Sequence, residues 1–446
     1  MTMTAFPQPY ADTLSRIAAK ERRATRENPQ RPDQPARASN IAAIVSFYES
    51  GIKPSGADER IGIELEHIIV HDDGRPVSYS GEHGVEELLG LLVKEYPRTT
   101  CDPQGDLLGV ARPGEAVTIE PAAQLELSAG PFSDLDTARA AFLSFEQHVD
   151  AILGPWGERL CNVGYHPTAK ARSLELIPKR RYQFMNMYLG ERDSEGVCMM
   201  RGSASTQVSI DFVSVPDCLR KLRLAFSLCP LFALMADNAP MFEGQPRTHQ
   251  MMRTSMWQHT DPDRCGLVPG ALDPAFTLED YASYILDTPA ILVSCTTNQW
   301  CFEDRTFGQI YANRTMTPAE VEHAVSMFFT DVRLKNYVEI RPADSMPIPF
   351  AIAYAALVKG VFYSDENLEA LDELLGTVTD EDYVAAQESL MQNGYDGIIY
   401  GRTAAELADT VVALAKQGLA QGELGHLVPL EELVSQRKTL ADLESL

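Results

Sequence analysis

Four short segments of this chain alternate apolar residues with acids, amides or arginine, as half-buried β-strands do. One of them, Gln124-Leu125-Glu126-Leu127-Ser128, places two amide or acid side chains and a serine on one face and two leucines on the other. The others are Ile63-Glu64-Leu65-Glu66, Gln207-Val208-Ser209-Ile210-Asp211-Phe212 and Val338-Glu339-Ile340-Arg341. Strands with one apolar and one polar face are typical of antiparallel sheets. The pattern therefore predicts a sheet lined with carboxylates.

The solvent-facing side of an ordinary antiparallel sheet would explain any one of these segments equally well. Such a face usually mixes lysine, threonine and serine, whereas these four carry no lysine and five acids: Glu64, Glu66, Glu126, Asp211 and Glu339. Two carboxylates ~4 Å apart repel by about 4 kcal/mol at an effective dielectric constant of ~20, so a face on which they converge requires cations. Hard oxygen ligands favour Mg²⁺ or Mn²⁺ over Zn²⁺, and protein-bound Mg²⁺ often also holds substrate phosphates.

Composition narrows the class of protein. The chain has 446 residues, of which 45% are hydrophobic, so it can bury a large core. Its formal net charge of −25 argues against binding to nucleic acids or anionic membranes. We find neither a signal-peptide pattern nor an apolar run long enough to span a bilayer, and expect a cytoplasmic location. The eight cysteines form no CxxC pair, so we expect reduced thiols and no zinc cluster.

The order of the elements favours an α+β fold over a doubly wound sheet, because strands occur in groups rather than in strict alternation with helices. Residues 1–40 form a basic, Pro- and Gln-rich stretch that we expect to be a flexible lead-in. Residues 41–446 would form a single domain whose last part, from about 350 to 446, is mainly helical. The individual helices are expected at 41–49, 86–96, 134–153, 216–236, 350–362, 367–375, 380–393, 404–417 and 430–443.

From about Ile61 onward, the chain resembles glutamate–cysteine ligase of the plant and proteobacterial type. Besides the four strand segments, the resemblance rests on ordered motifs: Tyr79-Ser80-Gly81-Glu82, Thr118-Ile119-Glu120-Pro121, Met200-Arg201, Arg253-Thr254-Ser255-Met256-Trp257, Thr260-Asp261-Pro262-Asp263-Arg264 and Val332-Arg333-Leu334-Lys335-Asn336-Tyr337. It implies a glutamine-synthetase-like fold, in which a curved antiparallel sheet forms a bowl with helices outside. It also implies ATP-dependent phosphorylation of the glutamate γ-carboxylate, followed by attack of the cysteine amine to give γ-glutamylcysteine, the first step of glutathione biosynthesis.

The resemblance also assigns candidate site residues. The metal ligands for Mg²⁺ or Mn²⁺ would be Glu64, Glu66, Glu120, Glu126, Gln207 and Glu339, with Asp211 as a weaker candidate that could instead orient a ligand. Glutamate would be bound around Arg253, Arg264, Trp257, Met200 and Arg201, since guanidinium groups bind carboxylates through two parallel hydrogen bonds. Arg341 and Lys335 would contact the transferred phosphate; a salt bridge to a nearby carboxylate is the alternative. Likewise, the two loop arginines could instead pair with Asp261 and Asp263.

Some positions depart from the family pattern. Ala122-Ala123 replaces a usual glycine pair, and Pro342 replaces a usual glycine, which restricts the backbone near the site. No cysteine follows Cys301, so the redox disulfide of plant members is not expected, although Cys295 and Cys301 could pair. The acceptor therefore stays open between cysteine and a different amine, with a catalytically silent metabolite-binding homologue as the other alternative. Either a monomer or a homodimer is compatible with the sequence.

Overall fold

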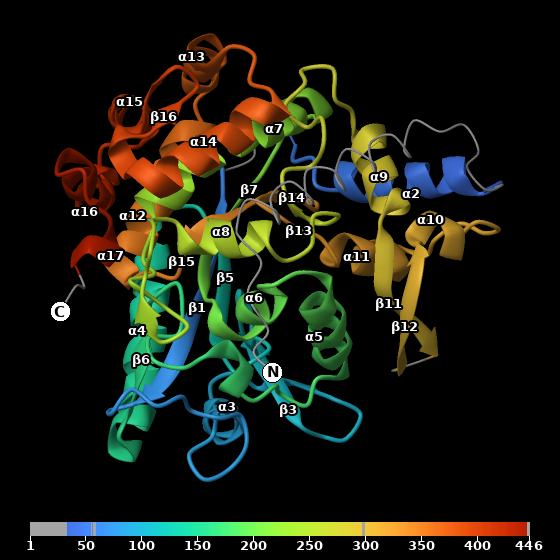
Figure 1. The fold of residues 1–446 in the computed structure, drawn as a ribbon, viewed down its shortest axis with the longest axis vertical. Helices are drawn as coiled ribbons and strands as arrows, with labels where there is room; N and C mark the ends of the chain where they lie inside the picture. Colours follow the sequence, from blue (N-terminus) through green and yellow to red (C-terminus); the bar gives the residue numbers. More distant parts are fainter. Residues whose placement is uncertain (1–33, 55, 57–58, 297–298, 444–446) are drawn as a thin grey trace, which may run out of the picture.

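The fold is built around one nine-stranded antiparallel sheet (Figure 1). The computed structural model describes residues 34–54, 56, 59–296 and 299–443. The strand order is β14-β15-β7-β1-β5-β4-β3-β2. The ninth strand, β6, pairs with the last four residues of β1, after the residues that pair with β5. The bounds of these strands are β1 (Ile61–His71), β2 (Arg98–Cys101), β3 (Leu107–Arg112), β4 (Glu115–Ile119), β5 (Leu125–Phe132), β6 (Glu158–Cys161), β7 (Ser205–Ile210), β14 (Val332–Leu334) and β15 (Val338–Asp344).

The four acidic segments are neighbouring strands, in the order β15-β7-β1-β5. In the register between β1 and β5, Glu66 lies opposite Glu126, and between β1 and β7, Glu64 lies opposite Gln207. Glu339 on β15 lies opposite Ser209. Residues opposite one another in an antiparallel pair project from the same face of the sheet. The predicted α+β fold with an acid-lined antiparallel sheet is therefore confirmed, and strand register explains why the acids converge.

Three long helices cover the apolar face of this sheet: α4 (Leu135–Leu153), α7 (Val215–Met235) and α12 (Ile348–Phe362). The alternate residues of the same strands, such as Leu65, Leu127 and Ile340, are fully buried on this side. Burying one such side chain stabilises the fold by roughly 1.5–3 kcal/mol. Asp134 accepts a hydrogen bond from the Thr137 amide and caps α4. Strand alternation therefore places the polar side chains on the face of the sheet opposite this core.

The C-terminal part packs around α12 as a group of helices: α13 (Asp365–Leu375), α14 (Asp380–Asn393), α15 (Ala404–Gly418), α16 (Leu424–Ser435) and α17 (Leu440–Leu443). The single helix predicted over 430–443 is wrong, because the chain forms α16 and α17 with a break between them. Arg437 in this break has a φ of 55°, in the left-handed region that a continuous right-handed helix cannot contain. The helix predicted over 86–96 is also shorter, since α3 (Val85–Leu92) ends four residues earlier.

Several elements on the polar side were not predicted from the sequence. They include α5 (Arg180–Arg192), α6 (Gly196–Gly202) and α8 (Met252–Gln258), the last of which lies within the stretch expected to be mostly loops. Away from α16 and α17, the opposite side of the molecule contains α2 (Arg37–Glu49), α9 (Leu278–Asp287), α10 (Phe307–Ile310), α11 (Pro318–Ser326) and the hairpin of β11 (Pro289–Thr296) and β12 (Gln299–Thr306) (Figure 1). The remaining elements are short: β8 (Met241–Phe242), β9 (Gln245–Pro246), β10 (Cys265–Gly266), β13 (Phe329–Thr330), β16 (Ile398–Ile399), β17 (Arg402–Thr403), and three 3₁₀ turns at Gly154–Trp156, Ala171–Ser173 and Gly394–Asp396.

Two expectations about the whole chain can be compared with the structure. Cys301 is disulfide-bonded, so the expectation that all cysteines are reduced thiols is wrong at this position. The suggested pairing of Cys301 with Cys295 cannot be compared, because the side chain of Cys295 lies outside the described part of the structure. Most of the basic lead-in also lies outside it. Helix α2 begins at Arg37. No helix within the described ranges is both long enough and apolar enough to cross a bilayer.

Candidate active site

The polar face of the sheet borders a cavity of about 320 Å³. Its walls come from strands β1, β5, β7, β14 and β15 and from the segments around α5, α6 and α8. Four carboxylates line it, namely Glu64, Glu66, Glu120 and Glu126, together with six cationic side chains, namely Lys179, Arg181, Arg253, Arg333, Lys335 and Arg341. A concave site with this many convergent charged groups is the expected place for a reaction between charged substrates.

The carboxylates are positioned by hydrogen bonds from neighbouring strands and loops. Glu66 accepts hydrogen bonds from the Ser205 amide at 2.7 Å and the Ser205 hydroxyl at 2.9 Å. Glu126 Oε1 accepts hydrogen bonds from the hydroxyls of Thr118 and Ser128, at 2.8 and 3.0 Å. Glu120 accepts a hydrogen bond from the Tyr182 hydroxyl at 3.2 Å. The carboxylate oxygens are therefore held in place by neutral donors.

Burial and repulsion between carboxylates make these acids weak, even though cationic side chains line the same cavity. Burial, followed by repulsion from Glu126 and Glu339, raises the pKa of Glu64 to about 8. Burial, followed by repulsion from Glu120, raises the pKa of Glu66 to about 8, and the same two causes raise the pKa of Glu126. A group of carboxylates that repel one another so strongly would bind a proton or a metal cation readily.

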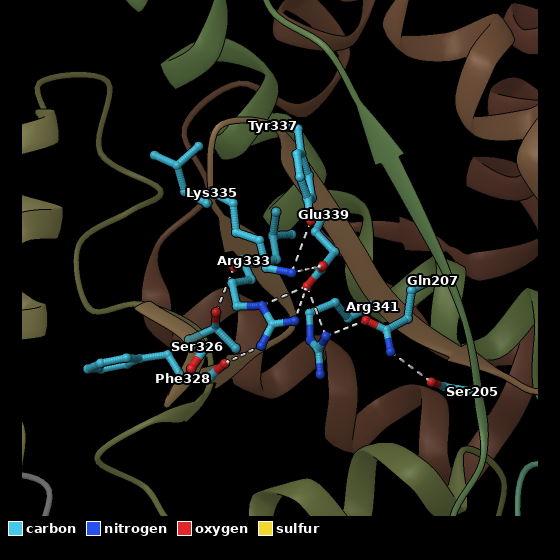
Figure 2. A network of polar contacts seen from close by, with 12 residues as sticks. Ser205, Gln207, Ser326, Phe328, Arg333, Lys335, Tyr337, Glu339 and Arg341 are labelled. Atoms are coloured by element: carbon cyan, nitrogen blue, oxygen red, sulfur yellow. Dashed lines mark hydrogen bonds and ion pairs between the residues drawn. The ribbon is translucent and has the colours of Figure 1, made fainter. Parts of the chain in front are cut away.

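Glu339 lies in a different electrostatic environment, although it is fully buried on the same face. Lys335 Nζ lies 2.7 Å from its Oε1, Arg333 Nη2 lies 2.7 Å from its Oε2, and Arg341 Nη1 lies 2.9 Å from the same Oε2 (Figure 2). Burial opposes its ionisation, but the three cations hold its pKa well below the usual range. Arg341 also donates a hydrogen bond to Gln207 Oε1. Lys335 and Arg341 thus form the salt bridges that the sequence left as an alternative.

Two cations that line the cavity at the start of α5, Lys179 and Arg181, were not predicted from the sequence. Lys179 precedes the first residue of this helix, and its Nζ lies 3.3 Å from the hydroxyl of Tyr182. Arg181 donates hydrogen bonds to the carbonyl and hydroxyl of Ser326, at 3.1 and 3.2 Å. The run Lys179-Arg180-Arg181-Tyr182, followed by apolar residues at helical spacing, was the signal that could have identified this helix. We add Lys179, Arg181 and Arg333 to the candidate site.

Arg253, Trp257 and Met200 reach the cavity as the resemblance implied. The Arg253 guanidinium carbon lies 5.5 Å from the centre of the Trp257 ring, within the range of a cation–π interaction. Although Arg253 is only 6% exposed, its Nε and Nη1 have no hydrogen-bond partner. Buried donors of this kind are costly unless something binds to them. Arg253 is therefore prepared for an anionic ligand.

Arg264 and Arg201 do not reach the cavity, contrary to what the resemblance implied. Arg264 is fully buried, pairs with Asp261 at 2.7 Å, and donates to the Pro289 and Met327 carbonyls. Arg201 donates hydrogen bonds to the Leu174 carbonyl and the Asn186 side chain. Arg264 is thus held inside the core, and Arg201 links α6 to Asn186 on α5 and to Leu174, so neither residue lines this cavity.

The carboxylates fit a divalent cation chemically. Glu64, Glu66, Glu120, Glu126 and the amide of Gln207 supply the oxygen donors that Mg²⁺ and Mn²⁺ prefer. Among the described residues, no three acidic, thiol or imidazole side chains are close enough together to form a preorganised metal centre. Burial, together with repulsion from Glu126 and Glu339 on Glu64 and from Glu120 on Glu66, raises the pKa of both acids, and a bound cation would offset this penalty on their ionised forms. Glu339 is the exception, because three protein cations already compensate its charge.

A second cavity, of about 460 Å³, continues along the same sheet face beyond Glu64, which lines both cavities. The backbones of Gly62, Gly114 and Gly130 contribute to its walls, and Lys53, Arg60 and Arg112 supply positive charge. Asp211, the weaker metal candidate, lies here and forms an ion pair with Lys53 at 3.3 Å. The structure thus separates Asp211 from the four carboxylates of the first cavity.

The departures Ala122-Ala123 and Pro342 lie at the edges of the site. Ala123 is buried in a tight turn with a φ of 66°, in the left-handed region that favours glycine. Its amide donates to the Glu120 carbonyl at 3.0 Å, and the Glu120 amide donates to the Gln124 carbonyl at 2.9 Å. This turn places Glu120 at its start and Gln124 at its end. Pro342 lines a small void next to Arg253 and Arg341.

Comparison with known proteins agrees with this architecture. In a solved structure of a glutamate–cysteine ligase from Francisella tularensis in complex with AMP, the fold matches with a TM-score of 0.53 at 14% identity, covering 88% of this chain and 85% of that one. The glutamine-synthetase-like α+β fold expected from the resemblance is thereby confirmed. Residues 60–439 match the family model described as glutamate–cysteine ligase family 2. The chain therefore belongs to the glutamate–cysteine ligase family 2, and it is an enzyme of the carboxylate–amine ligase class.

Curated relatives from plants extend this comparison. Glutamate–cysteine ligase B of Oryza sativa subsp. japonica is 27% identical over 416 residues, which cover 90% of this chain and 82% of the relative. The ligase of Arabidopsis thaliana is 28% identical over 420 residues, covering 90% of this chain and 78% of that protein. Both are described as chloroplastic, which contradicts the cytoplasmic location predicted from the sequence. The motifs used for that prediction concern membrane insertion and secretion and are uninformative about organelles.

Proposed function

We propose that this ligase joins the γ-carboxylate of glutamate to the amine of cysteine at the expense of ATP, forming γ-glutamylcysteine for glutathione biosynthesis. The observation that carries the proposal is the convergence of Glu64, Glu66, Glu120 and Glu126 beside six cations on one sheet face. Joining a carboxylate to an amine through an acyl phosphate brings phosphate and carboxylate groups together, and such a reaction requires both divalent metal and fixed positive charge. The names of the plant relatives and of the AMP-bound structure agree with this choice of substrates.

Mg²⁺ would be held by Glu64, Glu66, Glu120, Glu126 and Gln207. When bound, it would neutralise the phosphate oxygens and lower the barrier to phosphoryl transfer. The chain's own residues prepare this site. Thr118 and Ser128 orient Glu126, and Ser205 orients Glu66 through neutral hydrogen bonds that leave the negative charge uncompensated.

The nucleotide would lie along the second cavity, with its phosphates directed toward Glu64. This placement is supported by Glu64 lining both cavities and by the glycine backbones and cations of the second one. At the junction, Lys335, Arg333 and Arg341 surround Glu339, with N–O distances of 2.7, 2.7 and 2.9 Å. The N–H groups of these side chains that Glu339 does not occupy would stabilise the transferred phosphoryl group, and Glu339 would keep the cations in position.

Glutamate would bind at the other end of the first cavity. Arg253, with two unpartnered buried donors, would bind its α-carboxylate, and Trp257 and Met200 would pack against its methylene groups. The γ-carboxylate would then point toward Glu66 and the metal. An oxygen of the γ-carboxylate would attack the γ-phosphorus of ATP, and ADP would leave. The neutral amine of the acceptor would then attack the acyl phosphate carbon, phosphate would leave, and one proton from the amine would be released.

A phosphate-release assay tests the proposal directly. Purified protein with Mg²⁺, ATP and glutamate should release phosphate on addition of cysteine, with γ-glutamylcysteine detected by mass spectrometry. The same reaction without glutamate, and with aspartate in its place, serves as the control. Release that depends on a different amine alone would refute cysteine as the acceptor while leaving the ligase chemistry in place. Absence of release with every amine would contradict the whole proposal.

A further inference from the structure

The cations of the first cavity fall into two groups. Arg333, Lys335 and Arg341 all form ion pairs with the single carboxylate of Glu339. Lys179, Arg181 and Arg253 form no ion pair within the described part of the chain, although all three line the same cavity. Arg181 is instead held by hydrogen bonds to the carbonyl and hydroxyl of Ser326. An ammonium group has three N–H donors, and the Tyr182 hydroxyl can accept from only one of those of Lys179. The other donors are available to a ligand.

Lys179 and Arg253 occupy different sides of the carboxylate group. Lys179 lies beside Glu120, because the Tyr182 hydroxyl contacts both the Lys179 Nζ, at 3.3 Å, and Glu120, at 3.2 Å. Arg253 instead lies 5.5 Å from the centre of the Trp257 ring, and Glu66 is the carboxylate with the largest effect on its pKa. Arg253 is buried, whereas Lys179 is only half-buried, at the N-terminal end of α5, where the helix dipole adds positive potential. One cation therefore lies deep in the cavity and the other lies nearer to solvent.

Two amino-acid substrates would bring two α-carboxylates into this cavity, and each needs its own cation. This step rests on the proposed function, in which Arg253 binds glutamate. The acceptor must arrive at an acyl phosphate that already occupies the deeper part of the site, so its carboxylate is expected nearer to solvent. We propose that Lys179 binds the carboxylate of the acceptor, and that this contact selects an α-amino acid over a simple amine.

The test compares cysteine with cysteamine, which has the same thiol and amine but lacks the carboxylate. Wild-type enzyme should prefer cysteine. In Lys179→Met, kcat/KM for cysteine should fall by about 10- to 100-fold, the effect of losing one charge-assisted hydrogen bond. The value for cysteamine should fall far less, so the preference between the two acceptors should largely disappear. Lys179→Arg, which keeps the charge, should retain most of the preference.

Two controls separate this role from a structural one. Lys170→Met removes an exposed lysine that does not line the cavity and should leave the preference for cysteine unchanged. Thr118→Val breaks the hydrogen bond to Glu126 and should lower the rates with both acceptors by the same factor, because it acts through the carboxylate group. Thermal unfolding of each variant reports whether it is folded.

An equal loss with cysteine and cysteamine in Lys179→Met would overturn the assignment, because Lys179 would then act on glutamate, ATP or Glu120. An unchanged rate with both would overturn it as well. Failure of the proposed function looks different, since wild-type enzyme would then release no phosphate with either acceptor. A second pair, 2-aminobutyrate and propylamine, repeats the comparison without the thiol and should give the same change in preference.

Discussion

Two ends of one sheet face carry buried carboxylates with opposite electrostatic behaviour. Glu339 is fully buried, yet the cations Arg333, Lys335 and Arg341 keep it ionised. At the other end, Glu64 and Glu66 have pKa values raised to about 8, because burial and neighbouring acids disfavour their charge. The polypeptide therefore compensates the charge of Glu339 with its own side chains. At Glu64 and Glu66, ionisation would be favoured by a bound metal ion.

The two kinds of buried carboxylate should affect the stability of the protein in different ways. A buried carboxylate that is paired with cations stabilises the fold only as long as every partner remains, because removal of one leaves the others uncompensated. A buried carboxylate that lacks cations weakens the metal-free protein and gains stability when a metal binds. Stability measurements should therefore distinguish the two ends even though substitutions at both are expected to abolish turnover.

Glu339→Gln should have the largest effect, on stability and turnover together. The substitution leaves Arg333, Lys335 and Arg341 without their counter-charge, and breaking a buried ion pair typically costs about 3–5 kcal/mol. We expect a comparable loss in the free energy of unfolding, measured by urea denaturation, and no detectable phosphate release. The control is Glu431→Gln, which removes an exposed ion pair with Lys416 and should change stability by less than about 1 kcal/mol. A Glu339→Gln protein as stable as wild type would remove the distinction between the two ends.

Glu126→Gln should abolish turnover without destabilising the protein. Its Oε1 accepts both of the hydrogen bonds from Thr118 and Ser128, so a glutamine can keep them and place its amino group at the other position. The variant loses a metal ligand and should be slower by about 100-fold or more, since metal binding contributes several kcal/mol to transition-state stabilisation. Its urea midpoint in the absence of metal should equal or exceed that of wild type. Near-normal phosphate release would show that this face does not bind the metal.

The raised pKa values predict how pH and Mg²⁺ act on stability. Folded Glu64 and Glu66 retain protons up to about pH 8, whereas in the unfolded chain they release them near 4.5. The folded state thus binds more protons between these values, so its free energy of unfolding should fall as pH rises from about 5 to 8 without metal. Mg²⁺ binds the ionised carboxylates, and its stabilising effect should grow over the same range. Thermal unfolding at several pH values, with and without Mg²⁺, measures both trends.

Glu126→Gln provides the comparison for this experiment. Loss of one negative charge reduces the repulsion on Glu64, so the pH dependence of the metal-free protein should become shallower. Glu339 should contribute nothing to the trend, because its pKa lies well below this range. A stabilisation by Mg²⁺ that is independent of pH would indicate that the metal binds elsewhere.

The sequence predicted the face of the sheet better than the walls of the cavity. Alternation in β1, β5, β7 and β15 identifies the acids because side-chain direction in a strand follows directly from residue parity. Strand order and register depend on long-range pairing, and the sequence predicted neither of them. The family resemblance implied only the kind of sheet, a curved antiparallel one. The antiparallel α+β fold followed from the same information.

The cations and loops could not be predicted in the same way. Arg253 and Arg264 occur in one loop region and look equivalent in the sequence, but only the fold determines that Arg264 faces Asp261 and two carbonyls while Arg253 faces the cavity. Lys179 and Arg181 reach the site at the start of α5, whose apolar spacing indicates a helix but not what its N-terminal end contacts. Side-chain direction in loops and at helix ends is set by tertiary packing, which local sequence patterns do not encode.

The smallest predicted effect concerns the turn that holds Glu120. Ala123 adopts a φ of 66°, which is unfavourable for any residue with a Cβ atom. Ala123→Gly should therefore raise the free energy of unfolding, by up to about 1 kcal/mol, with turnover unchanged. Ala122 does not have a positive φ, so Ala122→Gly should lower stability by roughly 0.5–1 kcal/mol through the greater flexibility of glycine. If both substitutions destabilise equally, strain at Ala123 is not a property of this turn, and the position of Glu120 must depend chiefly on its hydrogen bond from Tyr182.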